Sequence, residues 1–247
     1  MKQQLIDFFA RVYHGSAGAL LCALHHLKND KKPTKLSKKY AQSYKKFYQN
    51  VYQTNPNDYY CCGRRILLSN GKCVEIVALN SLYLQQYDNF RGQGFISQEQ
   101  LDFVEEQMGW KKPKENVVRI VTMHHHYLPT CYTEVIDLSE RSSVVYDADR
   151  LMTWLIKHDV DILLHGHKHK KFFAQVSYPI DKTADKIASS NTKNLSVIAM
   201  GGTSCKCDEN VVSSIKFYSN KINIKFYRIF ANGSAEDYLC QEIEIEV

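Results

Sequence analysis

The chain has 247 residues, of which 44% are hydrophobic and 23% charged, and its formal net charge is +6. This composition is typical of a globular protein and excludes disorder over most of the chain. No apolar run approaches the roughly 20 residues that a membrane-spanning helix needs. The eight cysteines are too dilute for a disulfide scaffold, and Cys61 and Cys62 are adjacent, which suits reduced thiols. The sequence therefore predicts a soluble cytoplasmic protein that has no signal peptide and does not bind membranes.

The first 60 residues are predicted to form a helical N-terminal segment rich in lysine and tyrosine. Lysines gather in residues 28–46, which leaves two interpretations: a solvated helix face, or a surface that binds nucleic acid or another polyanion. Tyr40, Tyr44 and Tyr48 recur at every fourth residue, as in the buried stripe of a helix, and this spacing favours the first interpretation.

Strands and helices are predicted to alternate from residue 65 onward. Residues 66–69 and 74–81 flank an Asn-Gly turn, which favours a β-hairpin because both turn residues tolerate positive φ angles. Ser97 and Gln100 have the spacing of a capping box, so a helix is expected to begin there, with both side chains satisfying free backbone donors. The β-branched run 117–123 predicts a buried strand.

The next segments continue this alternation. Asp147 or Asp149 is expected to cap a helix over residues 149–158, and a short buried strand is expected at 161–164. Residues 181–194 are polar enough to form an exposed loop.

The C-terminal zone changes to a two-residue period. Apolar and polar residues alternate over 195–202, 212–219, 221–230 and 242–247, which predicts an antiparallel β meander. The expected fold class is therefore α/β, with a mixed sheet core followed by this meander, in one domain that covers residues 61–247.

Histidines directly follow two of the predicted buried strands. His124 follows the first, and His165, His167 and His169 occupy alternate positions after the second. Since strand carboxyl ends form the ligand-binding crevice of open α/β sheets, these imidazoles are expected to converge, and Gly166 is expected to let the backbone turn sharply toward them. Neutral imidazole is a common ligand of zinc, iron and manganese, so the pattern predicts a metal site, with carboxylates nearby that offset the charge.

At these histidines the sequence resembles the calcineurin-like metallophosphoesterases. The resemblance runs over about residues 66–202 and is carried by VTMHH at 121–125 and GHKH at 166–169. It implies an α/β/β/α sandwich of two packed sheets. It also implies hydrolysis of phosphate monoesters or diesters by a metal-activated hydroxide, at a centre of two divalent ions such as manganese, iron or zinc.

Taken position by position, the resemblance implies that His124 and His167 bind one metal and His169 the other. His125 and His165 have no settled ligand role and are expected to surround the ligands. The motifs that supply the family's remaining ligands, Asp-x-His, Gly-Asp-x-x-Asp and Gly-Asn-His, do not occur upstream of the strand that precedes His124. The chain therefore resembles only the C-terminal part of the family's domain, and no further catalytic residue is assigned.

The missing motifs leave three interpretations. The first is a metal-dependent phosphoesterase acting on a phosphate ester, active through other ligands or completed by another chain that carries the N-terminal half; three histidines alone can hold one metal ion with water in the fourth place. The second is a catalytically inactive phosphoesterase-like remnant, with one metal or none, that binds a partner or a polyanion through residues 28–46. The third is a truncated product without a stable fold.

Overall fold

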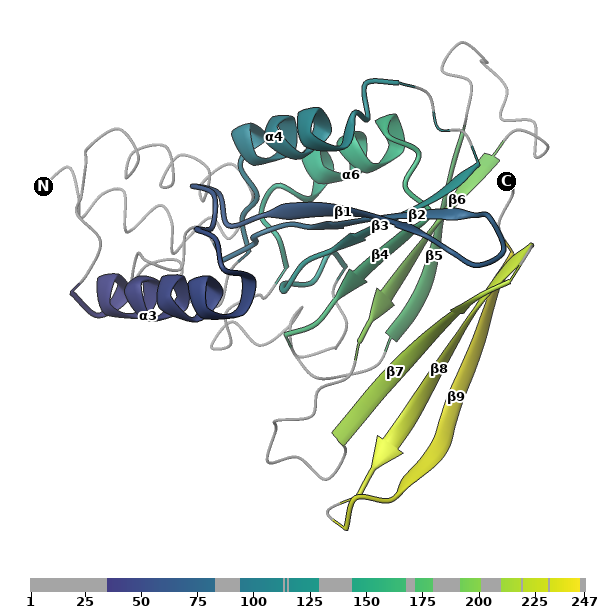
Figure 1. Cartoon of the computed structure of the whole chain (residues 1–247). Coiled ribbons are helices and arrows are strands. Elements are labelled where there is room, and N and C mark those ends of the chain that lie inside the picture. Colours follow the sequence, from purple (N-terminus) through teal and green to yellow (C-terminus); the bar gives the residue numbers. More distant parts are fainter. Residues whose placement is uncertain are drawn as a thin grey trace, which may run out of the picture.

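The structure of the protein is a computed structural model, in which two sheets lie one above the other and two helices cover the larger sheet (Figure 1). The residues that the structure describes are 35–82, 94–112, 114, 116–128, 144–167, 172–179, 192–200, 210–218, 220–230 and 232–244.

The larger sheet has six strands and is mixed. Its strands are β1 (Cys62–Leu67), β2 (Cys73–Ala78), β3 (Val117–Thr122), β4 (Ile162–His165), β5 (Phe172–Pro179) and β6 (Thr192–Ala199), in the order β1-β2-β3-β4-β6-β5. The central strands β2, β3, β4 and β6 run parallel, and the edge strands β1 and β5 are antiparallel to their neighbours. Parallel neighbours need crossover connections, and two helices supply them here: α4 (Gln98–Met108) between β2 and β3, and α6 (Ala148–Lys157) between β3 and β4.

Both faces of the larger sheet are buried. On one face Val77, Val121 and Leu163 pack with buried residues of the helices, among them Leu101 of α4 and Trp154 of α6. Because the central strands contact apolar layers on both sides, they need nearly continuous apolar runs such as those from which β3 and β4 were predicted.

The other face packs on a second sheet that is antiparallel, with β7 (Asn210–Phe217), β8 (Lys221–Ile229) and β9 (Ala235–Glu244) in that order. Val74, Ile120 and Ile198 of the larger sheet share one core with Ile222 and Phe226 of β8. Burying such a side chain contributes roughly 1.5–3 kcal/mol, so apolar contact between the two sheets stabilises their packing.

The predicted fold class is confirmed. The order of layers among the described residues is helices, mixed sheet and antiparallel sheet, which gives three successive layers of an α/β/β/α sandwich. The predicted hairpin is β1–β2, with Gly71 at a φ of 82° in its turn, and β7–β9 form the predicted C-terminal antiparallel meander. Residues 195–199, expected to begin that meander, belong instead to β6 of the larger sheet, which runs parallel to β4.

Two capping predictions need correction. The Ser97 hydroxyl accepts a hydrogen bond from the Gln100 backbone N–H (3.3 Å) as predicted, but the Gln100 side chain bonds the backbone of Asn80 instead of returning to Ser97. Asp147 precedes α6 without capping it, because its carboxylate pairs with Arg150 and accepts a weak hydrogen bond from the Ile96 N–H (3.4 Å). At Gln100 a tertiary partner replaces the local backbone donor; at Asp147 the side chain of the nearby Arg150 and a tertiary backbone N–H replace it.

One strand was missed by the sequence prediction. Strand β5 lies at the edge of the larger sheet and pairs along its whole length with β6. Its exposure alternates only in part, so its sequence lacks the strict two-residue period of a half-buried strand. The predicted exposed loop is also too long, because residues 192–194 belong to β6; residues 180–191 lie outside the described part.

The tyrosine stripe is only partly buried. Tyr44 and Tyr48 lie on helix α3 (Lys35–Tyr52), and Tyr44 is 47% exposed. Its ring contacts Tyr48 and Tyr60 at centroid distances of 6.2 and 5.6 Å. The prediction of a buried stripe is therefore wrong at Tyr44, whose ring packs against other surface rings, and the Tyr40 side chain lies outside the described part.

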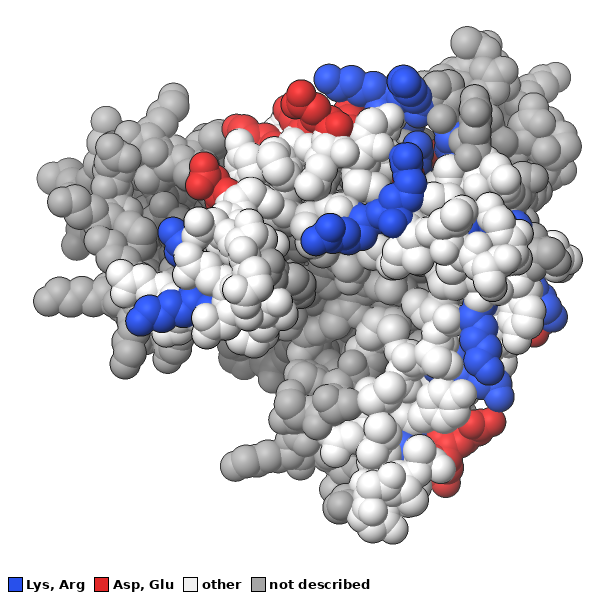
Figure 2. Space-filling view, in the orientation of Figure 1, with Lys and Arg blue, Asp and Glu red and all other residues white. Residues whose placement is uncertain are grey.

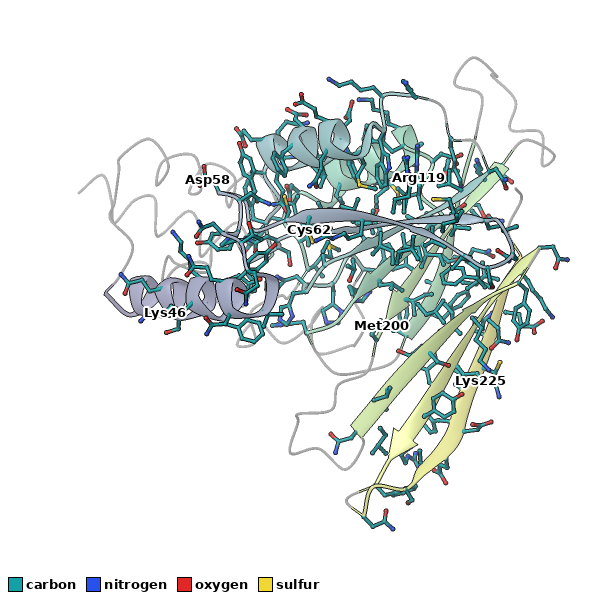
Figure 3. The ribbon with its side chains drawn as sticks, viewed as in Figure 1. Lys46, Asp58, Cys62, Arg119, Met200 and Lys225 are labelled. Carbon is teal, nitrogen blue, oxygen red and sulfur yellow. The ribbon has the colours of Figure 1, made fainter. Side chains whose placement is uncertain are left out.

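A buried ionic cluster lies on the helix-covered face of the larger sheet. The Glu75 carboxylate accepts hydrogen bonds from Arg119 Nε (3.0 Å), Trp110 Nε1 (2.7 Å) and Arg65 Nε (3.0 Å). Arg119, labelled in Figure 3, also donates to the His158 carbonyl (2.7 Å) and lies over the Trp110 ring, 4.8 Å from its centroid. Glu75 is 1% exposed and Arg119 4%, so each compensates a charge that water does not reach.

The described residues test the predictions on membrane spans and on free thiols only in part. No helix in the described ranges is both long and apolar enough to span a bilayer. Cys61 and Cys62 are free, and burial raises the pKa of Cys61 to about 12, which keeps its thiol protonated at neutral pH. The Cys205–Cys207 segment and residues 1–34 lie outside the described part.

Candidate metal centre

Polar residues lie at or just beyond the carboxyl ends of three neighbouring parallel strands, at one edge of the larger sheet. Ser81 lies just beyond β2, His124 just beyond β3, and His165 ends β4. The carboxyl ends of parallel strands lie at the same edge, so short segments that leave them meet in space. The predicted convergence of the histidines beyond β3 and β4 is seen for His124 and His167, and His169 lies outside the described residues.

His124, His125 and His167 form a compact cluster at this edge. One ring nitrogen of each lies within 4.8 Å of the others. His124 Nε2 and His167 Nδ1 are 2.8 Å apart, a hydrogen bond in which one nitrogen donates and the other accepts. His124 is exposed, His167 half-buried and His125 fully buried, so the cluster has one side in solvent and one side in the core.

The backbone that carries His167 is in an unusual conformation. His167 has a φ of 77°, in the left-handed region that non-glycine residues occupy at a cost of about 1–3 kcal/mol. Gly166 has no positive φ, so the sharp turn expected at Gly166 occurs at His167 instead. The Gly166 N–H donates to the His124 carbonyl (3.0 Å), which ties the two histidine segments together beyond the sheet.

His125 is held from behind by Ser81. The Ser81 hydroxyl lies 2.9 Å from His125 Nδ1 and accepts hydrogen bonds from the backbone N–H groups of His124 (3.2 Å) and His125 (3.1 Å). Burial, followed by repulsion from the nearby histidines, lowers the pKa of His125 to about 3, so its ring is neutral at neutral pH. His125 Nε2 is buried without a hydrogen-bond partner among the described residues.

The other histidines of the two motifs have different positions. His165 is 1% exposed and its ring lies 4.9 Å from that of the equally buried His126, so neither faces solvent. The His126 ring lies 6.0 Å from that of His167, which places this pair next to the cluster. His169, the expected ligand of a second metal, lies outside the described residues.

The donor set fits a transition-metal ion. Two nitrogen ligands about 2.0–2.1 Å from one tetrahedral or octahedral ion are about 2.9–3.4 Å apart, close to the separation of His124 Nε2 and His167 Nδ1. Imidazole nitrogens suit zinc, iron and manganese better than calcium or magnesium. Within the described residues no carboxylate belongs to this group, so the expected acidic ligands are absent from that part of the chain.

A comparison with protein-family models finds a match over the part of the chain that contains this cluster. A family model described as calcineurin-like phosphoesterase matches residues 24–171, more than half of the chain. The chain belongs to the calcineurin-like phosphoesterases. This family's match contains both histidine motifs up to His169, and no curated protein matches the chain.

The solved structures that match this phosphoesterase have low sequence identity and low TM-scores. Purple acid phosphatase PPD1 from yellow lupin (Lupinus luteus) is 11% identical, with a TM-score of 0.42, covering 76% of this chain and 33% of that chain. A putative 5′-nucleotidase from Staphylococcus aureus is 12% identical, with a TM-score of 0.27, covering 74% and 29%. A doubly substituted Vps29 from Entamoeba histolytica is 13% identical, with a TM-score of 0.27, covering 61% and 90%. The chain thus spans about a third of the length of the first two, and the family assignment rests on the family model.

Two residues at the cluster were not singled out from the sequence. Ser81 stood only as the last residue of a predicted strand, although a polar residue at the carboxyl end of a strand beside His124 is itself a signal. Gly94 drew no comment as a single residue, yet a Cβ built on it would lie 2.6 Å from His125 Cβ and 2.8 Å from His125 Cγ. The backbone at Gly94 therefore packs directly against the His125 side chain.

This contact predicts that Gly94→Ala lowers the free energy of unfolding by about 1–3 kcal/mol, because the added methyl group overlaps His125 and Val145. Urea unfolding would measure the loss. Gly166→Ala is the matched control: among the described residues its Cβ would meet only the His124 carbonyl oxygen, at 3.8 Å, and a change within about 0.5 kcal/mol is expected. Equal effects of the two substitutions would contradict the proposed overlap at Gly94.

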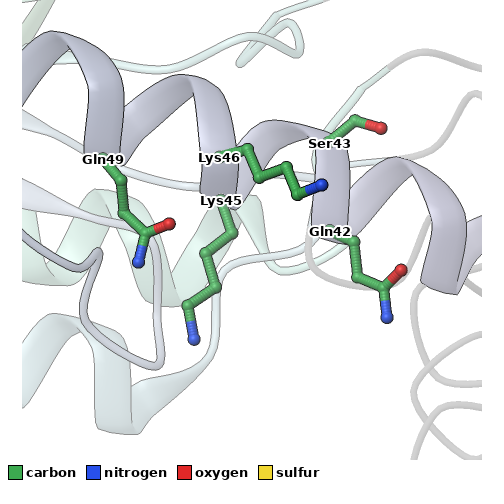
Figure 4. Close-up of a pocket in the computed structure, with 5 residues that line it drawn as sticks. All are labelled: Gln42, Ser43, Lys45, Lys46 and Gln49. Atoms are coloured by element: carbon green, nitrogen blue, oxygen red, sulfur yellow. The ribbon is translucent and has the colours of Figure 1, made fainter.

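A pocket elsewhere on the molecule lacks the features of this cluster. It lies on α3 and is lined by Gln42, Ser43, Lys45, Lys46 and Gln49 (Figure 4). Both lysines are exposed, so their charges are solvated. On the face shown in Figure 2, the basic side chains of the described residues are spread over several elements, with acidic ones near some of them.

Proposed function

We propose that the chain is a metal-dependent phosphoesterase in which His124 and His167 bind the same divalent ion. The observation that carries this proposal is the 2.8 Å separation of His124 Nε2 and His167 Nδ1, in a chain of the calcineurin-like phosphoesterase family. When bound, the ion would polarise a phosphoryl oxygen and lower the pKa of a coordinated water to about 7.

The residues around this pair favour such a role. The strained φ of His167 is retained next to His124, and strain of this kind concentrates at functional sites. The exposed His124 gives a phosphate ester access from solvent, while His125 is fully buried. The protein thus offers rigid ligands on the ends of two strands and an open side for the substrate.

His169 and additional carboxylates complete the proposed site. His169 would bind a second ion, of manganese, iron or zinc, as the family motif implies. Carboxylates are needed to offset the repulsion of two neighbouring divalent ions. Either other residues of this chain or a separate chain that carries the family's N-terminal motifs would supply them.

We place the protein in the cytoplasm, where its adjacent free thiols stay reduced.

The test of the function is metal retention together with hydrolysis. Protein loaded with manganese or zinc and then desalted is expected to retain about one ion or more per chain and to cleave a generic aryl phosphodiester. His124→Ala should abolish both, because it removes one of the two adjacent ligands. Wild-type protein that is folded, metal-free and inactive under these conditions would refute the enzyme proposal.

A second candidate function follows from α3. If the chain is a catalytically inactive remnant, the exposed Lys45 and Lys46 beside the α3 pocket would bind a polyanion such as a nucleic acid. Binding to a single-stranded oligonucleotide would then weaken steeply with salt and with Lys45→Glu, and would not respond to His124→Ala. Oligonucleotide binding that the lysine substitution leaves unchanged would refute this candidate.

A further inference from the structure

The Ser81 hydroxyl makes three contacts with two consecutive residues of the histidine cluster. Ser81 is 1% exposed, so water does not compete for these bonds. Its Oγ is an acceptor for the backbone N–H of His124 (3.2 Å) and for that of His125 (3.1 Å). The third contact, at 2.9 Å, is with His125 Nδ1, for which geometry alone leaves the direction open.

Counting the donors and acceptors at the Ser81 hydroxyl favours one direction. A serine hydroxyl has two acceptor lone pairs and one O–H donor. The two backbone N–H groups use both lone pairs, so the remaining contact is the one in which Ser81 O–H donates and His125 Nδ1 accepts. In a neutral imidazole only one nitrogen carries a proton, and a nitrogen that accepts is the unprotonated one. The proton of His125 is therefore on Nε2.

We propose that Ser81 is a positioning residue that fixes this tautomer, and that His125 binds an anionic phosphate oxygen through its Nε2–H instead of binding a metal. The Nδ1 lone pair, the only one on the ring, is engaged by Ser81, so His125 has no nitrogen left for a metal ion. The choice of a phosphate oxygen as the acceptor rests on the proposed function, whereas the tautomer does not.

The surroundings of the ring support an anionic ligand. His125 Nε2 is a fully buried donor without an acceptor among the described residues, which is destabilising unless a ligand supplies one. The His125 ring lies 4.8 Å from the His167 ring and 5.0 Å from the His124 ring, beside the two proposed metal ligands. No carboxylate of the described residues belongs to the cluster, so none of them lies among its ring nitrogens beside a bound anion.

The position of the ring is also restrained. The backbone at Gly94 leaves no room for a methyl group beside the Cβ and Cγ of His125, so this side of the imidazole is closely packed. Rotating the ring to expose Nδ1 would break the Ser81 bond and displace this contact. A substrate oxygen that reaches Nε2 therefore meets a donor that is already oriented.

The tautomer can be measured without activity. Two-bond ¹H–¹⁵N spectra of histidine-labelled, metal-free protein distinguish a protonated Nε2 from a protonated Nδ1. We expect His125 to be the Nε2–H tautomer in the wild type and in Ser81→Thr, which keeps the hydroxyl, and a mixture of tautomers in Ser81→Ala. A protonated Nδ1 in the wild type, or an unchanged tautomer in Ser81→Ala, would overturn the role of Ser81.

The division of roles can be measured by titration with zinc and then with inorganic phosphate. His125→Gln retains an N–H donor and His125→Ala does not, and both are expected to keep zinc affinity within about threefold of the wild type, whereas His124→Ala loses about 100-fold. Phosphate binding to the zinc-loaded protein should weaken by about 10- to 100-fold in His125→Ala, the loss expected for one hydrogen bond to a charged group. His125→Gln should restore most of it.

The failures of the two proposals are distinguishable. If His125→Ala and His125→Gln, both folded by thermal unfolding, lose zinc as His124→Ala does, then His125 is a metal ligand and the inference is wrong. Zinc-loaded wild type that binds no phosphate overturns the anion-binding role. Wild type that binds neither zinc nor manganese refutes the proposed phosphoesterase, while the spectra of metal-free protein still decide whether Ser81 sets the tautomer.

Discussion

Replacing Glu75 with alanine is expected to lower the free energy of unfolding by about 3–5 kcal/mol, the range for breaking a buried ion pair from one side. The substitution leaves the Arg119 guanidinium, 4% exposed, without its counter-charge, and the Trp110 indole N–H without its acceptor. Neither group can reach water without opening the layer between the sheet and its helices. Urea unfolding with an unchanged m-value would give the loss directly.

Two further variants separate the charge from the packing. Arg65 contacts the same carboxylate but its side chain is 63% exposed, so Arg65→Ala should cost only about 0–1 kcal/mol. The double variant Glu75→Leu/Arg119→Met should be less destabilised than the sum of the two single variants by more than about 1 kcal/mol, because the two charges are removed together. Additive losses would show that Glu75 and Arg119 act independently, contrary to the structure.

The same cluster shows where prediction from the sequence ends. Strand β2 contacts apolar layers on both faces, yet its sequence contains the charged Glu75. The spacing of apolar residues in β2 does not predict which cation pairs with Glu75. The pairing partner comes from Arg119 of β3, which lies opposite Glu75 only after the parallel register is formed. Local pattern therefore predicted the strand, and tertiary register determined the partner.

The candidate site likewise combines contacts that the sequence predicted with contacts that it did not. The two motifs alone predicted that His124 and His167 converge, since both follow buried strands that a right-handed parallel crossover brings side by side. The sequence could not predict that Ser81 bonds three atoms of the next segment, or that Gly94 packs on His125, because these contacts depend on loop geometry beyond the strand ends. The prediction that Tyr44 is buried was wrong for a related reason: helical spacing shows that a helix has an apolar face, but not whether that face packs against a core.

The other large effect is expected from metal binding itself: zinc at about 100 times its dissociation constant should stabilise the folded protein by about 2.7 kcal/mol and raise Tm by about 5–10 °C. A site assembled from β3 and β4 exists only in the folded chain, so the ion binds the native state in preference to the unfolded one. Thermal unfolding with and without zinc measures the shift. A chelator should reverse it, and the same concentration of magnesium, which prefers oxygen ligands, should not produce it.

The decisive variant is His167→Asn, which removes the imidazole but keeps a residue type that tolerates positive φ. Its stabilisation by zinc should fall below about 0.5 kcal/mol at the zinc concentration that stabilises the wild type. Asp159→Asn is the matched control, because Asp159 also has a positive φ, of 53°, but precedes β4 at the end of the strand opposite His167. Its zinc response should equal that of the wild type. If zinc still stabilises His167→Asn as strongly as Asp159→Asn, the ion binds elsewhere and His167 is not its ligand.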